Sequence, residues 1–338
     1  MANESMTNLL LQWYEKNGRE LPWRVKGGPH PDPYVILVSE FMLQQTTVKT
    51  VIPYFHRFMA RFPTVRDLAA AAEEDVYQLW QGLGYYTRAR SLHKTAQMIV
   101  NEYGGRFPDT REGVLKLKGI GAYTVASFLA LAFNQPETVI DGNVMRIIAR
   151  LYHLAAPLDE IADTIRQKAA ALTSREHPAD YASAVMDLGA VVCTPKNPQC
   201  LLCPWQEYCQ SRAAPDLEQI PVRRKLEKKE KQGAVFIVEN DRGEVLIRKR
   251  TEKGLLSGLY EFPWNDDGAV FDGVVDMKKS VTHVFTHIKL TLNIYKLKSN
   301  MELTPGSIFV RPENLSDYPL STLMKKVCHA YQKNPRRP

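Results

Sequence analysis

The segment CTPKNPQCLLCPWQEYC, residues 193–209, gives the strongest clue to the fold. Its four cysteines have the spacing C-x6-C-x2-C-x5-C, so four thiolates within 17 residues can surround one metal centre. Zinc sites usually combine two separate C-x2-C pairs, whereas here one pair has an outlying cysteine on each side. We therefore expect a [4Fe–4S] cluster, whose irons are spread apart, bound by Cys193, Cys200, Cys203 and Cys209. Zinc is the alternative.

The whole chain has ordinary globular composition. Of its 338 residues 44% are hydrophobic and 24% charged, which excludes extensive disorder, collagen-like repeats and a pure coiled coil. No apolar run approaches the ~18–20 residues of a membrane span, and the first twenty residues lack a signal-peptide pattern. We expect a cytoplasmic protein with no membrane partner, in which the fifth cysteine, Cys328, is an inert thiol.

The positive charge is unevenly distributed. The net charge of +7 combines 22 basic and 23 acidic residues in 1–220 with 22 basic and 14 acidic residues in 221–338. A basic excess indicates either a polyanionic partner such as nucleic acid or simple solubility.

The hydrophobic period changes once along the chain. From Leu9 to Cys209 apolar residues recur at spacings of three and four, which predicts roughly ten helices. After the basic stretch VRRKLEKKEK the period becomes that of strands, with a hairpin turn at 240–243 and a closing helix at 320–331. We predict a multidomain protein with an all-α domain over 1–220, a basic linker over 221–231 and a smaller α+β domain over 232–338.

Two glycines mark a candidate phosphate site in LKGIGAYTV, residues 117–125. Gly119 and Gly121 allow a tight turn with exposed backbone amides, and a helix begins at that turn. Amides and a helix N-terminus together bind phosphate without reading sequence. The segment therefore predicts a contact to a nucleic-acid backbone.

Two carboxylates stand in contrasting surroundings. Glu40 interrupts an apolar helix, with Ile36, Leu37 and Leu43 as its helical neighbours, so burial should raise its pKa and keep it protonated as a general acid. Asp141 ends an apolar run where a helix begins, so capping amides should favour its ionised form. One protonated and one ionised acid is the arrangement that glycosidic cleavage needs.

The cysteine spacing and the two-glycine hairpin resemble those of the endonuclease III-like, helix–hairpin–helix DNA glycosylases. VSEFMLQQT at 38–46 and QGLGYYTRAR at 81–90 resemble segments of the adenine DNA glycosylases (MutY family). The resemblance implies a monomeric, nucleoid-associated prokaryotic enzyme of base excision repair. It would bind double-stranded DNA, flip out an adenine mispaired with 8-oxoguanine or guanine, and excise it.

The resemblance also implies catalytic roles. Glu40 would protonate adenine N7, Asp141 would stabilise the sugar cation, and Asn143 would orient this acid network. Tyr123 stands where bifunctional relatives have a Schiff-base lysine, which implies a monofunctional enzyme.

Further residues resemble family residues that bind DNA or the base. Gln45 and Tyr85 would wedge into the duplex, Lys196 would approach the backbone, and the hairpin can also hold a monovalent cation in this family. Arg19, Leu21 and Trp23 would line the adenine pocket, while Ser183 replaces a glutamate that many members have there.

The C-terminal domain resembles the Nudix fold through GLLSGLYEFP at 254–263. Residues 266–279 lack the R-E-x-x-E-E helix of Nudix hydrolases, so we expect no pyrophosphatase activity. In the family this domain recognises the oxidised guanine, which implies that role for Phe285, Thr286 and His287.

Three alternatives are open at this point. The chain could be a bifunctional glycosylase/lyase for oxidised pyrimidines, a thymine mismatch glycosylase, or a non-enzymatic module that binds mismatches.

Overall fold

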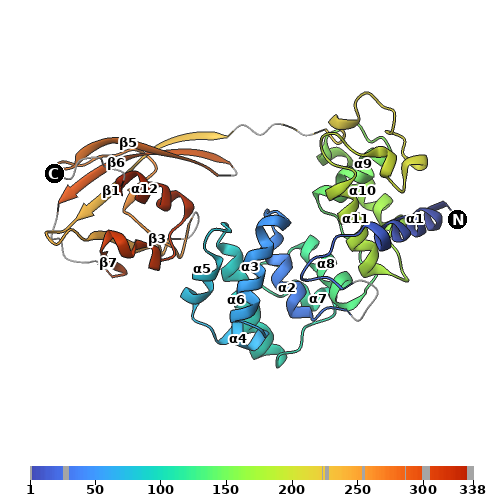
Figure 1. Cartoon of the computed structure of the whole chain (residues 1–338), viewed down its shortest axis with the longest axis horizontal. Coiled ribbons are helices and arrows are strands. Elements are labelled where there is room, and N and C mark those ends of the chain that lie inside the picture. Colours follow the sequence, from blue (N-terminus) through green and yellow to red (C-terminus); the bar gives the residue numbers. More distant parts are fainter. Residues whose placement is uncertain are drawn as a thin grey trace. The chain divides into compact units, whose positions relative to one another are not determined.

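The computed structural model describes residues 2–25, 30–222, 224, 228–252, 256–285, 287–298 and 305–332. The chain divides into two compact units. The first joins Met1–Ala70 to Ser91–Arg224, and the second joins Ala71–Arg90 to Lys225–Pro338. Figure 1 shows that helices build the first and that the second contains a sheet, which confirms the predicted fold class.

The first unit consists of α-helices and short 3-10 helices. They are α1 (Ala2–Asn17), α2 (Pro33–Leu43), α3 (Val48–Arg61), α4 (Val65–Ala70), most of α6 (Thr87–Tyr103), α7 (Arg111–Leu115), α8 (Ala122–Phe133), α9 (Gly142–Leu151), α10 (Leu158–Leu172), α11 (Pro178–Val191), η1 (Cys200–Leu202), η2 (Gln206–Tyr208) and η3 (Leu217–Gln219).

Two apolar helices, α2 and α8, form the centre of this unit. Residues 36–42 of α2 and 124–132 of α8 are all buried. A helix that is apolar all round must lie inside the protein, and these two pack against each other. Asp32 starts α2 by accepting a hydrogen bond from the Tyr34 amide at 2.8 Å, so the entry to the helix is fixed.

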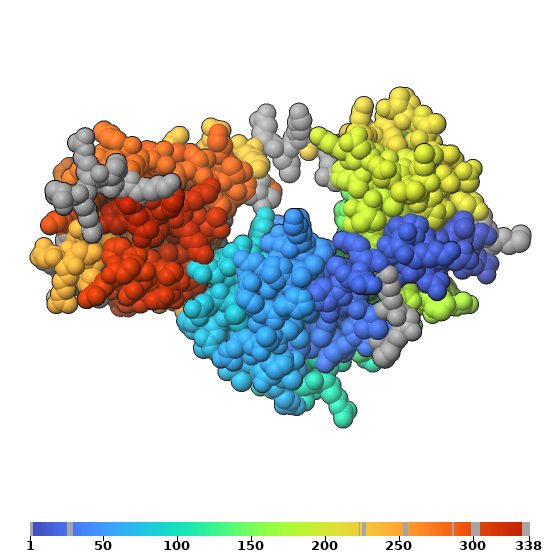
Figure 2. Space-filling view, in the orientation of Figure 1, coloured from blue at the N-terminus to red at the C-terminus, as the bar shows by residue number. Residues whose placement is uncertain are grey.

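A second group of helices, α1, α9, α10 and α11, has its own core. Leu10, Ile148 and Leu188 are fully buried there, and α11 also contacts α8. Figure 2 shows the N-terminal helix (dark blue) lying against the yellow-green residues of the later helices, in agreement with the contacts of α1 to α10 and α11. The first unit therefore has two helical groups that meet at α8 and α11.

The second unit combines one helix from the middle of the chain with the C-terminal sheet. Its elements are α5 (Glu73–Trp80), β1 (Lys229–Glu239), β2 (Val245–Lys249), β3 (Tyr260–Glu261), β4 (Trp264–Asn265), β5 (Val275–Val284), β6 (Ile288–Lys298), β7 (Ser307–Val310), η4 (Pro312–Asp317) and α12 (Thr322–Gln332).

The sheet has the order β3-β2-β1-β6-β5, with β4 added to β1 and β7 to β2. Strands β1 and β6 run parallel from the Lys229–Ile288 pair onward, while the other pairs are antiparallel. Val235 and Ile237 face α12, whereas Phe236 faces the other side and lies 4.8 Å from the ring of Phe271. Helix α12 thus covers one face, as in Figure 1.

The observed boundaries add detail to the expected ones. Strand β1 begins at Lys229, within the segment expected as a linker, because it continues its parallel pairing to the start of β6. Residues Ala71–Arg90 group with the sheet, although the helical period places them in the first domain. The expected hairpin turn forms, with Asn240 and Glu244 paired through their backbones at 2.9 Å.

Candidate functional site

Glu40 is buried at the centre of the first unit. Only 4% of the surface of Glu40 is exposed, because α2 packs on α8. The pKa of Glu40 is raised from 4.5 to about 7, mainly by burial and to a smaller extent by the charge of Asp141. The hydroxyls of Ser127 and Tyr123 and the Arg24 guanidinium act in the opposite direction on this pKa. A carboxyl group in this state can still hold a proton near neutral pH.

Asp141 caps α9, as the sequence predicts. One carboxylate oxygen, Oδ1, accepts hydrogen bonds from the Asn143 amide at 2.8 Å and the Val144 amide at 2.7 Å. The other, Oδ2, accepts from the Asn143 side-chain nitrogen at 2.9 Å. Three N–H donors therefore fix this carboxylate. Its negative charge raises the pKa of Glu40, which lies on α2 in the other helical group.

Tyr123, on α8, is close enough to both acids to feel their charges. Burial raises its pKa well above 10, and the charges of Glu40 and Asp141 add to that effect. The hydroxyl donates to the sulfur of Met186 at 3.6 Å. Tyr123 is therefore a neutral phenol at physiological pH. The structure brings Glu40, Tyr123, Asp141 and Asn143 together as one group.

Arg146 connects this group to the cysteine segment. It is 4% exposed, and its Nη2 donates to the Asn143 side-chain oxygen at 2.8 Å and to the Gly189 carbonyl at 2.7 Å. Its Nε donates to the carbonyl of Cys193 at 2.8 Å. Sequence reasoning missed this residue, although two arginines, Arg146 and Arg150, among the apolar buried residues of α9 are a detectable signal.

Of the residues expected to line the adenine pocket, Trp23 lines a cavity of about 50 Å³ in the first unit. Ser183 and the unpredicted Arg24 line it as well. Leu21, two residues before Trp23, is buried, with 9% of its surface exposed. Arg19 instead pairs with Asp187 on α11 at 2.6 Å.

Asp187 is a second residue that the sequence did not indicate. Its side chain is fully buried, and it accepts hydrogen bonds from the Arg19 amide at 2.8 Å and from Arg24 Nη1 at 2.8 Å. A buried carboxylate needs such partners, because an unpaired buried charge is costly. Asp187 thereby fixes the segment that carries the expected pocket residues against α11.

The two-glycine hairpin forms between α7 and α8. Gly119 has φ +74, and a Cβ there would lie 2.5 Å from the Ser91 Cβ, so only glycine fits. Gly121 is the N-cap of α8, and a Cβ there would meet nothing within 4 Å. Thr95 donates to the Lys118 carbonyl at 2.9 Å and supports the turn. Both glycines are exposed, as a phosphate site requires.

Both expected wedge residues adopt left-handed backbone conformations. Gln45 follows α2 with φ +56 in the first unit, and Tyr85 lies in the α5–α6 loop of the second unit with φ +49. Non-glycine residues rarely adopt this conformation, and functional sites often store such strain. Both side chains are exposed, Tyr85 by 48%. Lys196 is also exposed, in the loop before η1.

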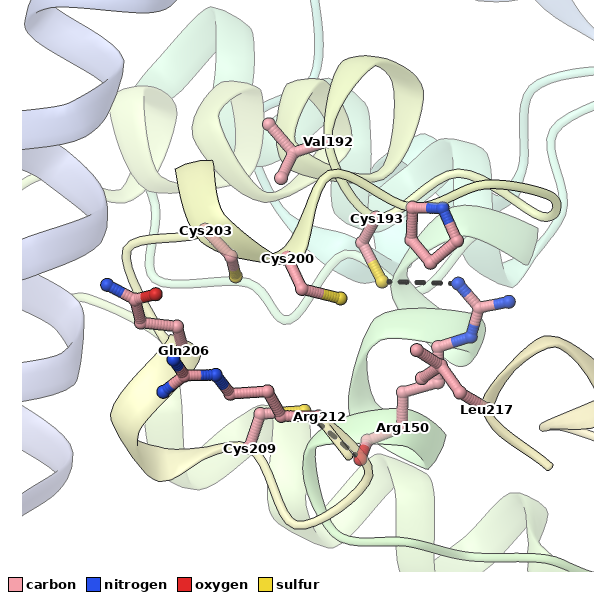
Figure 3. A pocket seen from close by; sticks show the side chains of 10 residues that line it. Arg150, Val192, Cys193, Cys200, Cys203, Gln206, Cys209, Arg212 and Leu217 are labelled. Atoms are coloured by element: carbon pink, nitrogen blue, oxygen red, sulfur yellow. Dashed lines mark hydrogen bonds between the residues drawn. The ribbon is translucent and has the colours of Figure 1, made fainter. Parts of the chain in front are cut away.

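The four cysteines line one cavity of about 30 Å³ (Figure 3). Burial, together with the smaller effect of the neighbouring thiolates, raises the pKa of Cys203 to about 12, so four thiolates need a compensating positive centre. Among the described residues no three such side chains are close enough for a single metal ion. Four cysteine sulfurs around one cavity match the thiolate ligand set of an iron–sulfur cluster.

Arg150 holds the cysteine segment in place. It is 1% exposed and donates to the carbonyls of Thr194 at 2.6 Å, Pro195 at 3.0 Å and Ile220 at 3.1 Å. Its Nη1 lies 3.6 Å from the Cys193 sulfur, as drawn in Figure 3. The guanidinium therefore places positive charge beside the thiolates that would hold the cluster.

In the second unit, Phe285 and His287 line a cavity of about 560 Å³ together with residues 82–87. Phe285 lies 4.6 Å from the ring of His283, and the His287 carbonyl accepts from the Lys229 amide at 3.0 Å. Thr286 lies outside the described residues. Residues 266–274 form turns and irregular backbone, followed by β5.

Three family models match successive parts of the chain. The model "HhH-GPD superfamily base excision DNA repair protein" matches residues 38–171, "Iron-sulfur binding domain of endonuclease III" matches 193–209, and "NUDIX domain" matches 234–330. The chain is 33% identical to the adenine DNA glycosylase of Rattus norvegicus, over 97% of this chain and 78% of that protein.

The chain belongs to the adenine DNA glycosylase family. It is 32% identical to the adenine DNA glycosylase of Buchnera aphidicola subsp. Acyrthosiphon pisum, over 87% of this chain and 86% of that one. The predicted enzyme class, an adenine DNA glycosylase of base excision repair with DNA as its partner, is therefore confirmed. The predicted iron–sulfur cluster is confirmed as well.

Solved structures support the helical fold. A thermostable thymine-DNA glycosylase is 26% identical with a TM-score of 0.54, covering 62% of this chain and 98% of its own. Endonuclease III trapped on DNA is 22% identical with a TM-score of 0.52, covering 62% of this chain and 94% of its own, and shows a shared fold. No helix in the described part of the chain is long and apolar enough to span a membrane.

Proposed function

We propose that this enzyme removes adenine mispaired with 8-oxoguanine or guanine, with Glu40 as general acid and Asp141 as the stabilising carboxylate. The observation that carries the proposal is the buried Glu40, whose pKa lies at about 7, beside the triply hydrogen-bonded Asp141. Glu40 gives its proton to N7 of a flipped adenine, and the electron pair of the glycosidic bond leaves with the base. Asp141 faces the resulting sugar cation, to which water adds with loss of a proton.

Asn143 and Tyr123 support this step without exchanging protons. Asn143 holds the second carboxylate oxygen of Asp141 while Arg146 holds Asn143. Tyr123 is a neutral phenol and cannot form an imine with the sugar, so we propose a monofunctional enzyme. Efficient trapping of the DNA by borohydride, with catalytic strand cleavage, would contradict this part of the proposal.

Contacts to the DNA backbone come from exposed backbone and a few cations. Gly119 and Gly121 offer amides at the start of α8, where the helix dipole also attracts phosphate. Lys196 adds a positive charge, and carbonyls of the hairpin are candidates for a monovalent cation. Gln45 and Tyr85 are the proposed wedges. The enzyme acts as a monomer on nucleoid DNA in this proposal.

The sheet unit is the proposed reader of the oxidised guanine. Phe285 and His287 line a cavity that also borders the Tyr85 loop, and Thr286 between them supplies a hydroxyl. The four cysteines hold a [4Fe–4S] cluster in this proposal, which supplies a rigid support for the Lys196 loop.

A panel of duplexes with adenine opposite 8-oxoguanine, guanine, cytosine or thymine tests the substrate. We expect abasic product in the first two, strand breaks only after alkali, and a preference for 8-oxoguanine that falls in His287→Ala and Phe285→Ala variants. Release of thymine or an oxidised pyrimidine instead of adenine would refute the assignment, and binding without base release would favour a non-enzymatic module.

A further inference from the structure

The loop that carries Tyr85 is braced from within its own unit. Trp80 Nε1 donates to the Gly84 carbonyl at 3.1 Å. Arg88 Nη2 donates to the carbonyls of Leu83 at 3.3 Å and Gly84 at 3.1 Å. These bonds hold the backbone that directly precedes Tyr85, and the Arg88 amide donates to the Tyr85 carbonyl at 2.9 Å. The loop runs between helices α5 and α6, which are linked by a separate set of contacts.

Arg90, in the first turns of α6, joins both helices to the sheet region. Its Nε lies 2.9 Å from the Tyr77 hydroxyl and 3.5 Å from the Glu73 carboxylate, both on α5. Its Nη2 donates to the Ser257 carbonyl at 2.7 Å and lies 3.4 Å from the Ser257 hydroxyl. One guanidinium thus bridges α5, α6 and a turn that follows β2, 167 residues further along the chain.

The turn fits closely around this guanidinium. Gly258 has φ +86, and a Cβ there would lie 2.4 Å from Arg90 Nη2 and 3.2 Å from the Tyr77 hydroxyl. Ser257 is 8% exposed, so its contact with Arg90 is shielded from water. Glycine is therefore required both by the backbone conformation and by the space that Arg90 fills.

The other end of the loop has a separate tie. Gln81, directly after α5, donates from Nε2 to the Tyr318 carbonyl at 3.1 Å. The Tyr85 loop is therefore anchored to the sheet region at both of its ends. The same loop and the lesion-reading residues Phe285 and His287 border one cavity.

We propose that Arg90 is a positioning residue that fixes the Tyr85 loop to the lesion-reading region through the Ser257–Gly258 turn. The inference rests on the roles proposed above for Tyr85 and for Phe285–His287. Tyr85 and the lesion-reading residues Phe285 and His287 then move together. Correct placement of Tyr85 in the duplex therefore also places the lesion-reading residues. Arg90 itself touches neither the base nor the sugar in this account.

An Arg90→Met variant of the full-length, cluster-loaded enzyme tests the proposal. Loss of the hydrogen bonds that Arg90 makes to Ser257 and Tyr77 should lower the preference for adenine opposite 8-oxoguanine over adenine opposite guanine by at least about tenfold. Amide hydrogen exchange of residues 81–86, measured without DNA, should rise by about tenfold as well. A purely structural role would lower the melting temperature and leave the preference ratio unchanged.

Arg66→Met is the matched control. Arg66 Nη2 donates to the Gly104 carbonyl at 2.7 Å, beside another glycine with positive φ, but in the first unit. It should change neither the preference ratio nor exchange in 81–86. Equal ratios and equal loop exchange in Arg90→Met and Arg66→Met would overturn the proposal.

Gly258→Ala gives a second, independent variant should Arg90→Met fold poorly. The added methyl displaces the guanidinium, so this variant should show the same loss of preference, and combining it with Arg90→Met should add little. Full additivity of the two losses would overturn the proposal. A wild-type enzyme without any preference for 8-oxoguanine would contradict the proposed function, whereas the exchange measurement would still decide the role of Arg90.

Discussion

Replacing Glu40 by glutamine should stabilise the protein while it abolishes catalysis. The pKa of Glu40 is raised from 4.5 to about 7 by burial, so the folded protein holds this proton more tightly than the unfolded chain does. As the pH rises above 4.5, unfolded Glu40 ionises freely while folded Glu40 resists ionisation. The wild-type protein therefore loses stability relative to the neutral, isosteric glutamine, and the loss levels off above pH 7.

The size of this effect follows from the pKa difference. At 1.36 kcal/mol per pH unit, Glu40→Gln should raise the free energy of unfolding by about 1 kcal/mol at pH 5 and about 3 kcal/mol at pH 8. Enzymes commonly sacrifice stability in this way at a functional site. Glu102→Gln, an exposed change on α6, should alter the free energy of unfolding by less than about 0.5 kcal/mol at either pH.

Urea unfolding of the cluster-loaded chain, followed by circular dichroism at pH 5 and pH 8, provides the measurement. The reasoning predicts a gain for Glu40→Gln that grows with pH, with no such trend in the control. A gain independent of pH, or a variant less stable than wild type at pH 8, would refute the view that Glu40 is a buried acid with a raised pKa.

Three further predictions concern the same unit. The single-turnover rate of adenine release should fall as the pH rises above about 7, because Glu40 then loses the proton it must donate; a rate that stays constant to pH 9 would contradict this. Arg146→Met should slow adenine release by about tenfold or more, because the Asn143 side-chain oxygen loses its buried donor. Single-turnover kinetics measure this rate, with the exposed change Arg166→Met as the control that should leave it unchanged. Cys203→Ser should lose the visible absorption of the cluster, measured by spectroscopy, and an unchanged spectrum would remove Cys203 from the ligand set.

Much of the site was predictable because local patterns determine it. An acid within the apolar helix α2 had to be buried, and an aspartate at the start of α9 had to meet free amides. The cysteine spacing and the two-glycine turn are likewise local. Each prediction depended on residues within a few positions of one another, where helical geometry fixes the neighbours.

The missed residues have partners that are distant in sequence. Arg146 binds the carbonyl of Cys193, 47 residues away, and Arg90 binds that of Ser257, 167 residues away. No period or spacing encodes such pairs, because they depend on how whole elements pack. The same reason explains β1, whose start at Lys229 is set by parallel pairing with β6 rather than by its own composition.

The most direct test of the central claim compares wild type with Glu40→Gln on a duplex that contains one adenine opposite 8-oxoguanine. Single-turnover release of adenine should be rapid for the wild type and lost in Glu40→Gln, although both proteins bind the duplex and retain the cluster. Normal release by the glutamine variant would show that Glu40 is not the acid, and the account of this site would fail.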